Sequence, residues 1–314
     1  GKYALQENDD GDDNIAIGFD ALKLNDGDDN IAIGKYALEL NDGSYNIAIG
    51  KYALQESEGG DDNIAIGFEA LEYNDDGDYN IAIGEHALQY NYGDDNIALG
   101  YNALYNNEGD DNIAIGEDAL EYNDDGDYNI AIGKESGITI TTGSGNTFLG
   151  AYSDASIGTL SNSTAIGYGA TVTLSNTIQL GNTDIEVIRG QVAFTNASDR
   201  RLKENIIASK YGLSEVLKLE PVDYVLKSNG LKQVGFIAQD VKPLIPEVVT
   251  GVEGDLEKGE TLGITYTSLI PVLTKAIQEQ QTIISRLEKM LLSSLERQKV
   301  IEKELIEIRS SIKQ

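Results

Sequence analysis

The amino-acid sequence predicts a β-solenoid shaft, followed by a small α+β domain that ends in a coiled coil. Three observations support this fold class: a 16- to 17-residue repeat, a change of charge after it, and a heptad pattern near the C-terminus. Residues 1–150 contain 33 Asp and Glu against 5 Lys and Arg, whereas residues 151–314 contain 20 against 18. The chain therefore has at least two regions of different character.

The shaft repeats the unit N-I-A-I-G-x-x-A-L, followed by a polar loop. Ile alternates with Ala in residues 63–67, which predicts a short strand with its large residues on one face. About eleven layers at ~4.8 Å give a rod of roughly 50 Å. One coil would leave a face uncovered, so we expect three coils to bury their Ile and Leu stripes together. The closing glycines, spaced by 16 or 17 residues and finally by 14, indicate a stacked solenoid; they are Gly1, Gly18, Gly34, Gly50, Gly67, Gly84, Gly100, Gly116, Gly133, Gly150, Gly167 and Gly181.

The loops of the shaft are rich in Asp, Asn and Gly. Clustered carboxylates on such turns suit calcium, a hard cation that prefers oxygen ligands. The alternative is a solvated turn whose Asp and Asn tolerate left-handed backbone, and it is favoured because no EF-hand loop or G-G-x-G-x-D nonapeptide is present. Weak calcium binding therefore stays a secondary expectation, and no cofactor is required. Its candidate ligands are Asp10, Asp12, Asp76, Asp78, Asp125 and Asp127.

Composition argues against several classes of protein. A formal net charge of −30 leaves no basic stripe to neutralise nucleic-acid phosphates. The chain has no Cys, so it can form no disulfide or thiolate metal site. No apolar run is long enough to span a bilayer, so we expect no membrane insertion. The chain begins with Gly1 and its only Met is Met290, which suggests an excised fragment that lacks an N-terminal anchoring region.

Residues 1–185 resemble the head repeats of trimeric autotransporter adhesins and the related shafts of phage tail fibres. The unit at residues 163–170, S-T-A-I-G-Y-G-A, is particularly close to the adhesin-head repeat. This resemblance implies a trimeric parallel β-roll. The acid-rich loops are longer than in those heads, so loop details do not carry over.

Five ordered motifs follow the shaft, and together they carry a more specific resemblance. They are S-D-R-R-L-K-E-N-I at 198–206, L-E-P-V-D-Y at 219–224, G-F-I-A-Q-D-V at 235–241, I-P-E-V-V at 245–249 and I-T-Y-T-S-L-I-P-V-L at 264–273. The set is similar to the intramolecular chaperone domain of phage endosialidases, tail spikes and tail fibres. That family implies a domain that trimerises, assists folding of the shaft before it, and then cleaves itself off.

By this resemblance the scissile bond joins Ala197 to Ser198. Ser198 is the implied nucleophile, and Lys203 the implied general base and later proton donor. A free Ser hydroxyl is a weak nucleophile and a free Lys is protonated at neutral pH, so we expect burial and a nearby cation, such as Arg200 or Arg201, to activate Lys203. The alternative is an uncut domain in which Ser198 caps a helix that starts near Arg200. Residues expected to support the site are Asp199, Arg200, Gln239 and Asp240.

A terminal helix is predicted from about 267 to 313. Apolar residues recur at heptad positions, with polar residues that can fix the register. Mixed Ile and Leu at a, with Ile at two d positions, favours three strands over two. Position a holds Ile277, Ile284, Leu291, Gln298, Leu305 and Ile312, and position d holds Gln280, Leu287, Ser294, Ile301 and Ile308.

These patterns and resemblances predict four segments: an acidic β-roll at 1–185, closing strands with the cleavage linker at 186–197, an α+β chaperone and peptidase domain at 198–266, and a trimeric coiled coil at 267–314. The expected protein is a homotrimeric tail fibre or tail spike of a virion, assembled in the host cytoplasm, that binds a host receptor or glycan. Its peptidase acts once in cis and on no external substrate. The alternative is a trimeric adhesin, or a fibre of a phage-like contractile injection system, without cleavage.

Overall fold

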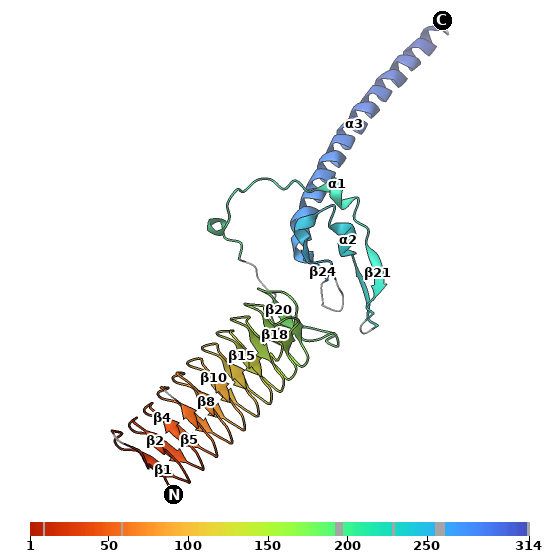
Figure 1. The fold of residues 1–314 in the computed structure, drawn as a ribbon. Helices are drawn as coiled ribbons and strands as arrows, with labels where there is room; N and C mark the ends of the chain where they lie inside the picture. Colours follow the sequence, from red (N-terminus) through yellow and green to blue (C-terminus); the bar gives the residue numbers. More distant parts are fainter. Residues whose placement is uncertain (9, 58, 192–196, 228–229, 255–260, 313–314) are drawn as a thin grey trace. The chain divides into compact units, whose positions relative to one another are not determined.

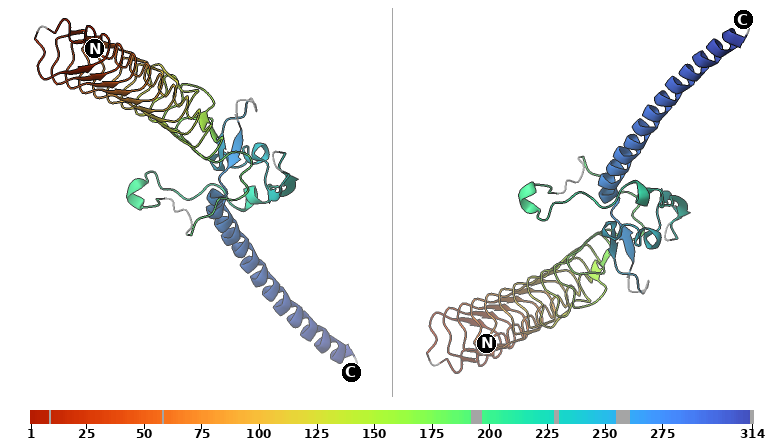
Figure 2. Two further views of the ribbon diagram at one scale, coloured as in Figure 1. Left: turned by 90° about the horizontal axis from the view of Figure 1, so that it is seen from below. Right: turned by 90° about the horizontal axis from the view of Figure 1, so that it is seen from above.

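The computed structural model describes residues 1–312 except 9, 58, 192–196, 228–229 and 255–260 (Figure 1). It divides into two compact units, Gly1–Ile188 and Arg189–Gln314. The first unit is a solenoid of short parallel strands, and the second is a small mixed domain with a long C-terminal helix (Figure 2). The predicted fold class is therefore confirmed at the level of the single chain.

The N-I-A-I-G units form one face of the solenoid. Each contributes a three-residue strand that pairs in parallel with its counterpart in the next repeat, so that Ile47 lies opposite Ile64 and Ala48 opposite Ala65. Within the described residues this sheet has eleven strands. They are β1 (Ile15–Ile17), β3 (Ile31–Ile33), β5 (Ile47–Ile49), β7 (Ile64–Ile66), β9 (Ile81–Ile83), β11 (Ile97–Leu99), β13 (Ile113–Ile115), β15 (Ile130–Ile132), β16 (Thr147–Leu149), β18 (Thr164–Ile166) and β20 (Ile178–Leu180).

Two-residue strands form a second face. They follow the A-L step of each repeat, and seven of them make one parallel sheet among the described residues, while two later ones pair separately. The first group is β2 (Leu24–Asn25), β4 (Leu40–Asn41), β6 (Glu56–Ser57), β8 (Tyr73–Asn74), β10 (Tyr90–Asn91), β12 (Asn106–Asn107) and β14 (Tyr122–Asn123), and the second is β17 (Asp154–Ala155) with β19 (Thr171–Val172).

The interior of each rung is built from the small residue of the strand and the A-L step. Ala48, Ala53 and Leu54 are fully buried, whereas Ile49 keeps 37% of its side-chain area exposed. The alternation thus places Ile on the outer face, as predicted. The expectation that partner coils bury a Leu stripe is wrong, because the Leu side chains already fill the core of their own coil.

Backbone geometry explains why the repeat tolerates so little variation. Gly50 has φ +151°, and a Cβ atom added there would lie 1.9 Å from the carbonyl oxygen of Gly67 in the next rung. Leu54 adopts φ +47°, a left-handed conformation that costs an L-residue roughly 1–2 kcal/mol. Burying a Leu side chain contributes about 1.5–3 kcal/mol, which offsets that cost.

Buried Asn side chains connect the rungs. The Asn63 N–H donates to Asn46 Oδ1 at 2.8 Å, and Asn46 Nδ2 donates to the Gly60 carbonyl at 2.7 Å. A second Asn row lies on the other face, where Asn91 Nδ2 donates to Asn74 Oδ1 at 2.8 Å. These ladders satisfy amide groups that would otherwise be buried without partners. The sequence did not predict that the Asn residues form these ladders.

The second unit is an α+β domain, as predicted. Its elements are α1 (Leu213–Val216), the antiparallel pair β21 (Val222–Val225) and β22 (Lys232–Gly235), α2 (Ala238–Val241), the pair β23 (Val249–Gly251) and β24 (Leu262–Ile264), and α3 (Leu269–Ile312), with 3₁₀ turns η1 (Arg200–Leu202), η2 (Pro246–Val248) and η4 (Tyr266–Ser268). Its core is small, and consists of Val241, Ile245, Val248, Leu269 and Val272 with partly buried neighbours.

The long helix α3 is mostly exposed beyond its first turns. Ile284 keeps 40%, Leu287 54% and Leu291 62% of their side-chain area exposed. These residues occupy predicted a and d positions of the heptad. No helix among the described residues is both long enough and apolar enough to cross a membrane.

The closing strands expected within 186–197 are not found where the chain is described. Residues 186–191 and 197 form no strand, and residues 192–196 lie outside the described part. Ile185 and Val187 alternate as a strand would, yet each is more than half exposed. Among the described strands β20 pairs with β18 alone, so no later segment extends the sheet.

Candidate functional site

The predicted nucleophile and base lie in direct contact. Lys203 Nζ donates a hydrogen bond to Ser198 Oγ at 2.7 Å. Both side chains are exposed in the single chain, and so is Ala197. The expectation that Lys203 is buried is therefore wrong for the isolated chain, in which every residue from 197 to 208 is exposed.

A single local turn brings the two side chains together. The 3₁₀ turn η1 lies between them, and the Lys203 N–H closes it by donating to the Arg200 carbonyl at 3.2 Å. Asp199 is the N-cap: its Oδ1 accepts from the Arg201 N–H at 2.8 Å. The alternative in which Ser198 caps this helix is wrong, because the cap is the next residue.

Several side-chain hydrogen bonds between Asp199 and Arg201 stabilise this turn. Arg201 Nη2 donates to Asp199 Oδ2 at 2.7 Å, and Arg201 Nε donates to both carboxylate oxygens. These bonds hold the pKa of Asp199 below its usual value. Asp199 was expected to support the site, and Arg201 was expected only as a cation near Lys203; its pairing with Asp199 was not predicted, although the two-residue spacing of Asp and Arg was the signal. Arg200, which was expected there as well, makes no side-chain hydrogen bond or ion pair with any described residue.

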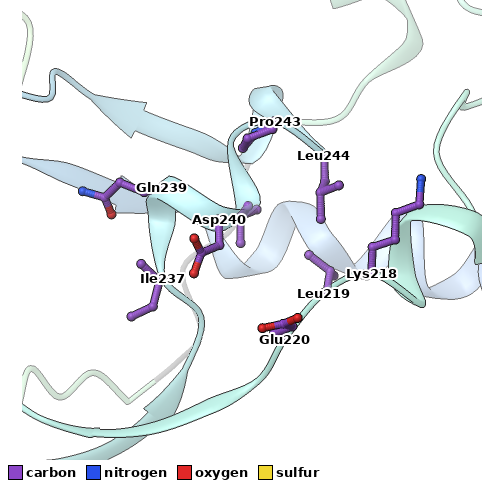
Figure 3. Close-up of a pocket in the computed structure, with 9 residues that line it drawn as sticks. Lys218, Leu219, Glu220, Ile237, Gln239, Asp240, Pro243 and Leu244 are labelled. Atoms are coloured by element: carbon purple, nitrogen blue, oxygen red, sulfur yellow. The ribbon is translucent and has the colours of Figure 1, made fainter.

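Gln239 and Asp240 lie apart from the dyad. They line a cavity of about 390 Å³ together with Lys218, Leu219, Glu220, Ile237, Val241, Pro243 and Leu244 (Figure 3). Gln239 Nε2 donates to Glu253 Oε1 at 3.2 Å. Among the described residues neither side chain bonds to Ser198 or Lys203. The structure thus brings the L-E-P-V-D-Y and G-F-I-A-Q-D-V motifs together in one cavity.

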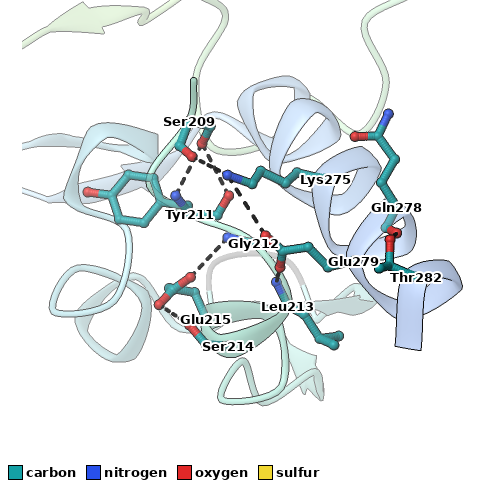
Figure 4. A network of polar contacts seen from close by, with 10 residues as sticks. All are labelled: Ser209, Tyr211, Gly212, Leu213, Ser214, Glu215, Lys275, Gln278, Glu279 and Thr282. Carbon is teal, nitrogen blue, oxygen red and sulfur yellow. Dashed lines mark hydrogen bonds and ion pairs between the residues drawn. The ribbon is translucent and has the colours of Figure 1, made fainter. Parts of the chain in front are cut away.

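The chain after the dyad is fastened to α3 at Ser209–Leu213 (Figure 4). Glu279 Oε2 accepts from the Leu213 N–H at 2.8 Å, and Lys275 Nζ donates to the Ser209 carbonyl at 2.5 Å. Tyr211 also donates to Glu247. Everything from Ala197 to Ala208 is exposed. The dyad therefore sits on a segment that is anchored to the domain only at its C-terminal end.

The acidic loops contain a hydrogen-bonded row rather than loose carboxylates. The Asp61 N–H donates to Asp78 Oδ1 at 2.7 Å, and the Asp110 N–H donates to Asp127 Oδ1 at 3.0 Å. Asp12 donates its own N–H to Asp28 Oδ1. In the part of the chain that the structure describes, no group of three or more His, Cys, Asp and Glu is arranged to hold a metal ion. Calcium binding stays an untested prediction.

A row of aromatic side chains follows one edge of the solenoid. Tyr36 and Tyr52 stack with ring centroids 5.2 Å apart, and Lys51 Nζ lies 4.2 Å from the Tyr52 centroid. Other neighbouring rings in this row, Tyr3, Phe19, Tyr52 and Phe68 among them, meet edge to face. Such contacts between successive rungs stabilise the rod.

The model of the Chaperone of endosialidase family, a peptidase family known for self-cleavage, matches residues 198–250. The match begins at Ser198 and covers the first four motifs of the domain. No curated protein matches the chain. A β-solenoid followed by such a segment is the organisation of a tail-fibre-like protein with an endosialidase-type chaperone domain.

Proposed function

We propose that the chain is a homotrimeric tail-fibre protein of a virion, whose C-terminal domain aligns three shafts and then releases itself by cutting Ala197–Ser198. The observation that carries this proposal is the 2.7 Å contact between Lys203 Nζ and Ser198 Oγ. It lies at the first residue of the segment that matches the chaperone family. The shaft then serves in attachment to a host surface, through a receptor or glycan.

The cleavage follows from the chemistry of this pair. Ser198 Oγ attacks the carbonyl carbon of Ala197 while neutral Lys203 accepts the hydroxyl proton. The bond between the Ala197 carbonyl carbon and the Ser198 nitrogen then breaks, and the Lys203 ammonium returns the proton to that nitrogen. The product is an ester between Ala197 and Ser198 Oγ. Water hydrolyses it, leaving a carboxylate on Ala197 and a free hydroxyl on Ser198.

Assembly is the step that activates this chemistry. Lys203 is exposed in the single chain, where an ammonium is well solvated and a poor base. Burial of the exposed segment in a trimer disfavours the charged form and so favours a Lys203 that can accept a proton. Cutting therefore follows correct association of the three chains.

Two exposed apolar stripes support a trimer. The outer face of the eleven-stranded sheet presents an Ile or Leu in successive rungs, each with more than a third of its side-chain area exposed: Ile33, Ile49, Ile66, Ile83, Leu99, Ile132, Leu149 and Ile166. The second stripe follows the heptad of α3 and includes Ile277, Ile284, Leu287, Leu291, Ile301, Leu305 and Ile308. Continuous patches of this kind mark interfaces. A three-stranded helix bundle suits the mixture of Ile and Leu at its core positions.

The test is expression of the wild type beside Ser198→Ala and Lys203→Arg, followed by denaturing gels and mass spectrometry. The wild type is expected to convert from 33.9 kDa into two fragments that separate before Ser198. Both variants are expected to stay intact, because Ala lacks a nucleophile and Arg keeps its charge but cannot accept a proton. Ser214→Ala, an exposed serine on α1, is the control and should cut normally. A trimeric wild type that remains at full length would contradict the cleavage.

A further inference from the structure

We propose that the cavity formed by Lys218–Glu220 and Ile237–Leu244 is a docking site for the segment 198–207 of a second copy of this chain, with Arg200 as its anchor. This inference rests on the proposed trimer. The L-E-P-V-D-Y and G-F-I-A-Q-D-V motifs, which lie apart from the dyad in the single chain, then form a binding site. A neighbouring chain uses this site to hold the segment that is cut.

The cavity has the chemistry to take an arginine side chain. Glu220 and Asp240 contribute carboxylates from two different segments, and neither side chain forms a hydrogen bond or ion pair with a described residue (Figure 3). Leu219, Ile237 and Leu244 line the same cavity. An arginine can lay its aliphatic stem on apolar surface while its guanidinium binds carboxylates with several directed hydrogen bonds.

The segment 198–207 has the complementary character. The Arg200 side chain forms no hydrogen bond or ion pair with a described residue, in contrast to Arg201, which is held by Asp199. Leu202 is 71%, Ile206 55% and Ile207 86% exposed. A stretch that combines an unpaired cation with three exposed apolar side chains gains from burial on a surface that is acidic and apolar.

The anchoring of this segment fixes how far it can reach. The Lys275 and Glu279 contacts hold the chain at Ser209 and Leu213, so Arg200 stands nine residues before the first anchored residue (Figure 4). An extended chain of that length spans roughly 30 Å. In the single chain residues 198–207 are exposed, so the segment does not fill the cavity of its own domain. The trimer proposed above supplies further copies within that reach, and a second copy is the occupant we assign.

The absence of Cys in the sequence gives a clean test by cross-linking. Leu202→Cys and Lys218→Cys are combined in the uncut Ser198→Ala chain, so that Arg200 and Asp240 stay in place, and the trimer is treated with a short bismaleimide, which spans a wider range of distances than a disulfide. Docking between copies predicts covalent dimers and trimers on denaturing gels. Leu202→Cys with Asp223→Cys, which places the second thiol on the hairpin outside the cavity, is the control and should give few.

Each result decides the proposal. Cross-linking within one chain, visible as a shifted monomer band, would overturn the assignment to a second copy. A trimer with no product above the control would overturn docking at this cavity. Light scattering on the same samples separates these failures from failure of the proposed function, because a monomeric chain would contradict the trimer itself.

A charge exchange supplies an independent readout in the cutting chain. Asp240→Arg is expected to slow self-cleavage about tenfold, because it removes a hydrogen bond between charged groups and places two cations together. The combination Arg200→Asp with Asp240→Arg is expected to recover most of the rate. In variants that light scattering shows to be trimeric, a double variant no faster than the single ones would overturn the pairing.

Discussion

The shaft and the C-terminal domain differ in how much of their apolar surface they bury within the single chain. In the shaft, each rung buries its own Ala and Leu and bonds its buried Asn to the next rung, so the single chain already has a continuous core. Among the described residues the second unit buries only six apolar side chains, one of them an Ala, and leaves the heptad residues of α3 exposed. The comparison teaches that the shaft leaves one apolar face exposed, whereas the domain leaves most of its apolar surface exposed.

The largest expected effect tests the close stacking of the shaft. Gly50→Asn should prevent folding of the surrounding rungs, with a cost above about 4 kcal/mol, because a Cβ atom there meets the Gly67 carbonyl at 1.9 Å. Gly145→Asn is the matched control: its φ of +68° suits Asn, and nothing lies nearer than 4.0 Å. Thermal unfolding followed by circular dichroism compares them. Equal midpoints would contradict the stacking.

The next effect tests the dependence of the domain on partners. Leu287→Asp places a charge at a d position of the heptad and is expected to abolish the trimer at micromolar concentration. Leu292→Asp, one residue after an a position, should leave it intact, although the two side chains are similarly exposed in the single chain, at 54% and 62%. Light scattering after size-exclusion chromatography gives the mass. If both variants trimerise, the heptad assignment is wrong.

A smaller effect compares buried and exposed ladders within the shaft. Asn80→Ala leaves the buried Asn96 N–H and the Gly93 carbonyl without their partner and should cost about 2–4 kcal/mol. Asp94→Ala removes an exposed acceptor from the Asp78 N–H, where water can replace it, and should cost about 1 kcal/mol or less. Urea unfolding gives both free energies. If Asp94→Ala lowers the free energy of unfolding as much as Asn80→Ala does, this ranking is wrong.

The smallest effect concerns the pH dependence of one buried carboxyl. Burial raises the pKa of Asp154 above its usual value, despite hydrogen bonds from Thr139 and Ala155. Folding therefore favours the protonated form, and this group adds stability as pH falls through its folded pKa toward its unfolded one. At pH 7, Asp154→Asn should unfold at a temperature equal to or slightly higher than that of the wild type. When the pH is lowered, the variant should lack the stability that protonation of Asp154 adds to the wild type. Comparing the variant with the wild type at each pH cancels the repulsion among the other acidic residues.

The sequence predicted the repeat architecture well because each rung is set by local rules. Ile and Ala alternate, a Gly follows them, and the same pattern recurs often enough to fix the register. The sequence did not predict where the Leu side chains lie. Leu54 was expected in an outer stripe, but its left-handed backbone turns the side chain into the core of its own coil. Simple periodicity does not indicate such a conformation.

At the candidate site, the Ser198–Lys203 pair was predicted from the resemblance of residues 198–206 to the chaperone family, because the spacing of Ser and Lys alone is not specific. Arg201 was named only as a cation near Lys203, and its bonds to Asp199, which stabilise the turn, were not predicted. The sequence did not separate the dyad from Gln239 and Asp240, because their distance depends on tertiary packing. Burial of Lys203 is not found in the single chain, where residues 197–208 are exposed.

The Asn ladder has a consequence for how such a shaft changes over generations. The same hydrogen bond recurs between successive rungs. The Asn46 N–H donates to Asn30 Oδ1, and the Asn63 N–H donates in the same way to Asn46 Oδ1. Recombination between near-identical repeats can therefore add or delete whole rungs without creating an unmatched junction. Length becomes a heritable variable that shifts in steps of one rung, about 4.8 Å each, while the C-terminal domain stays unchanged.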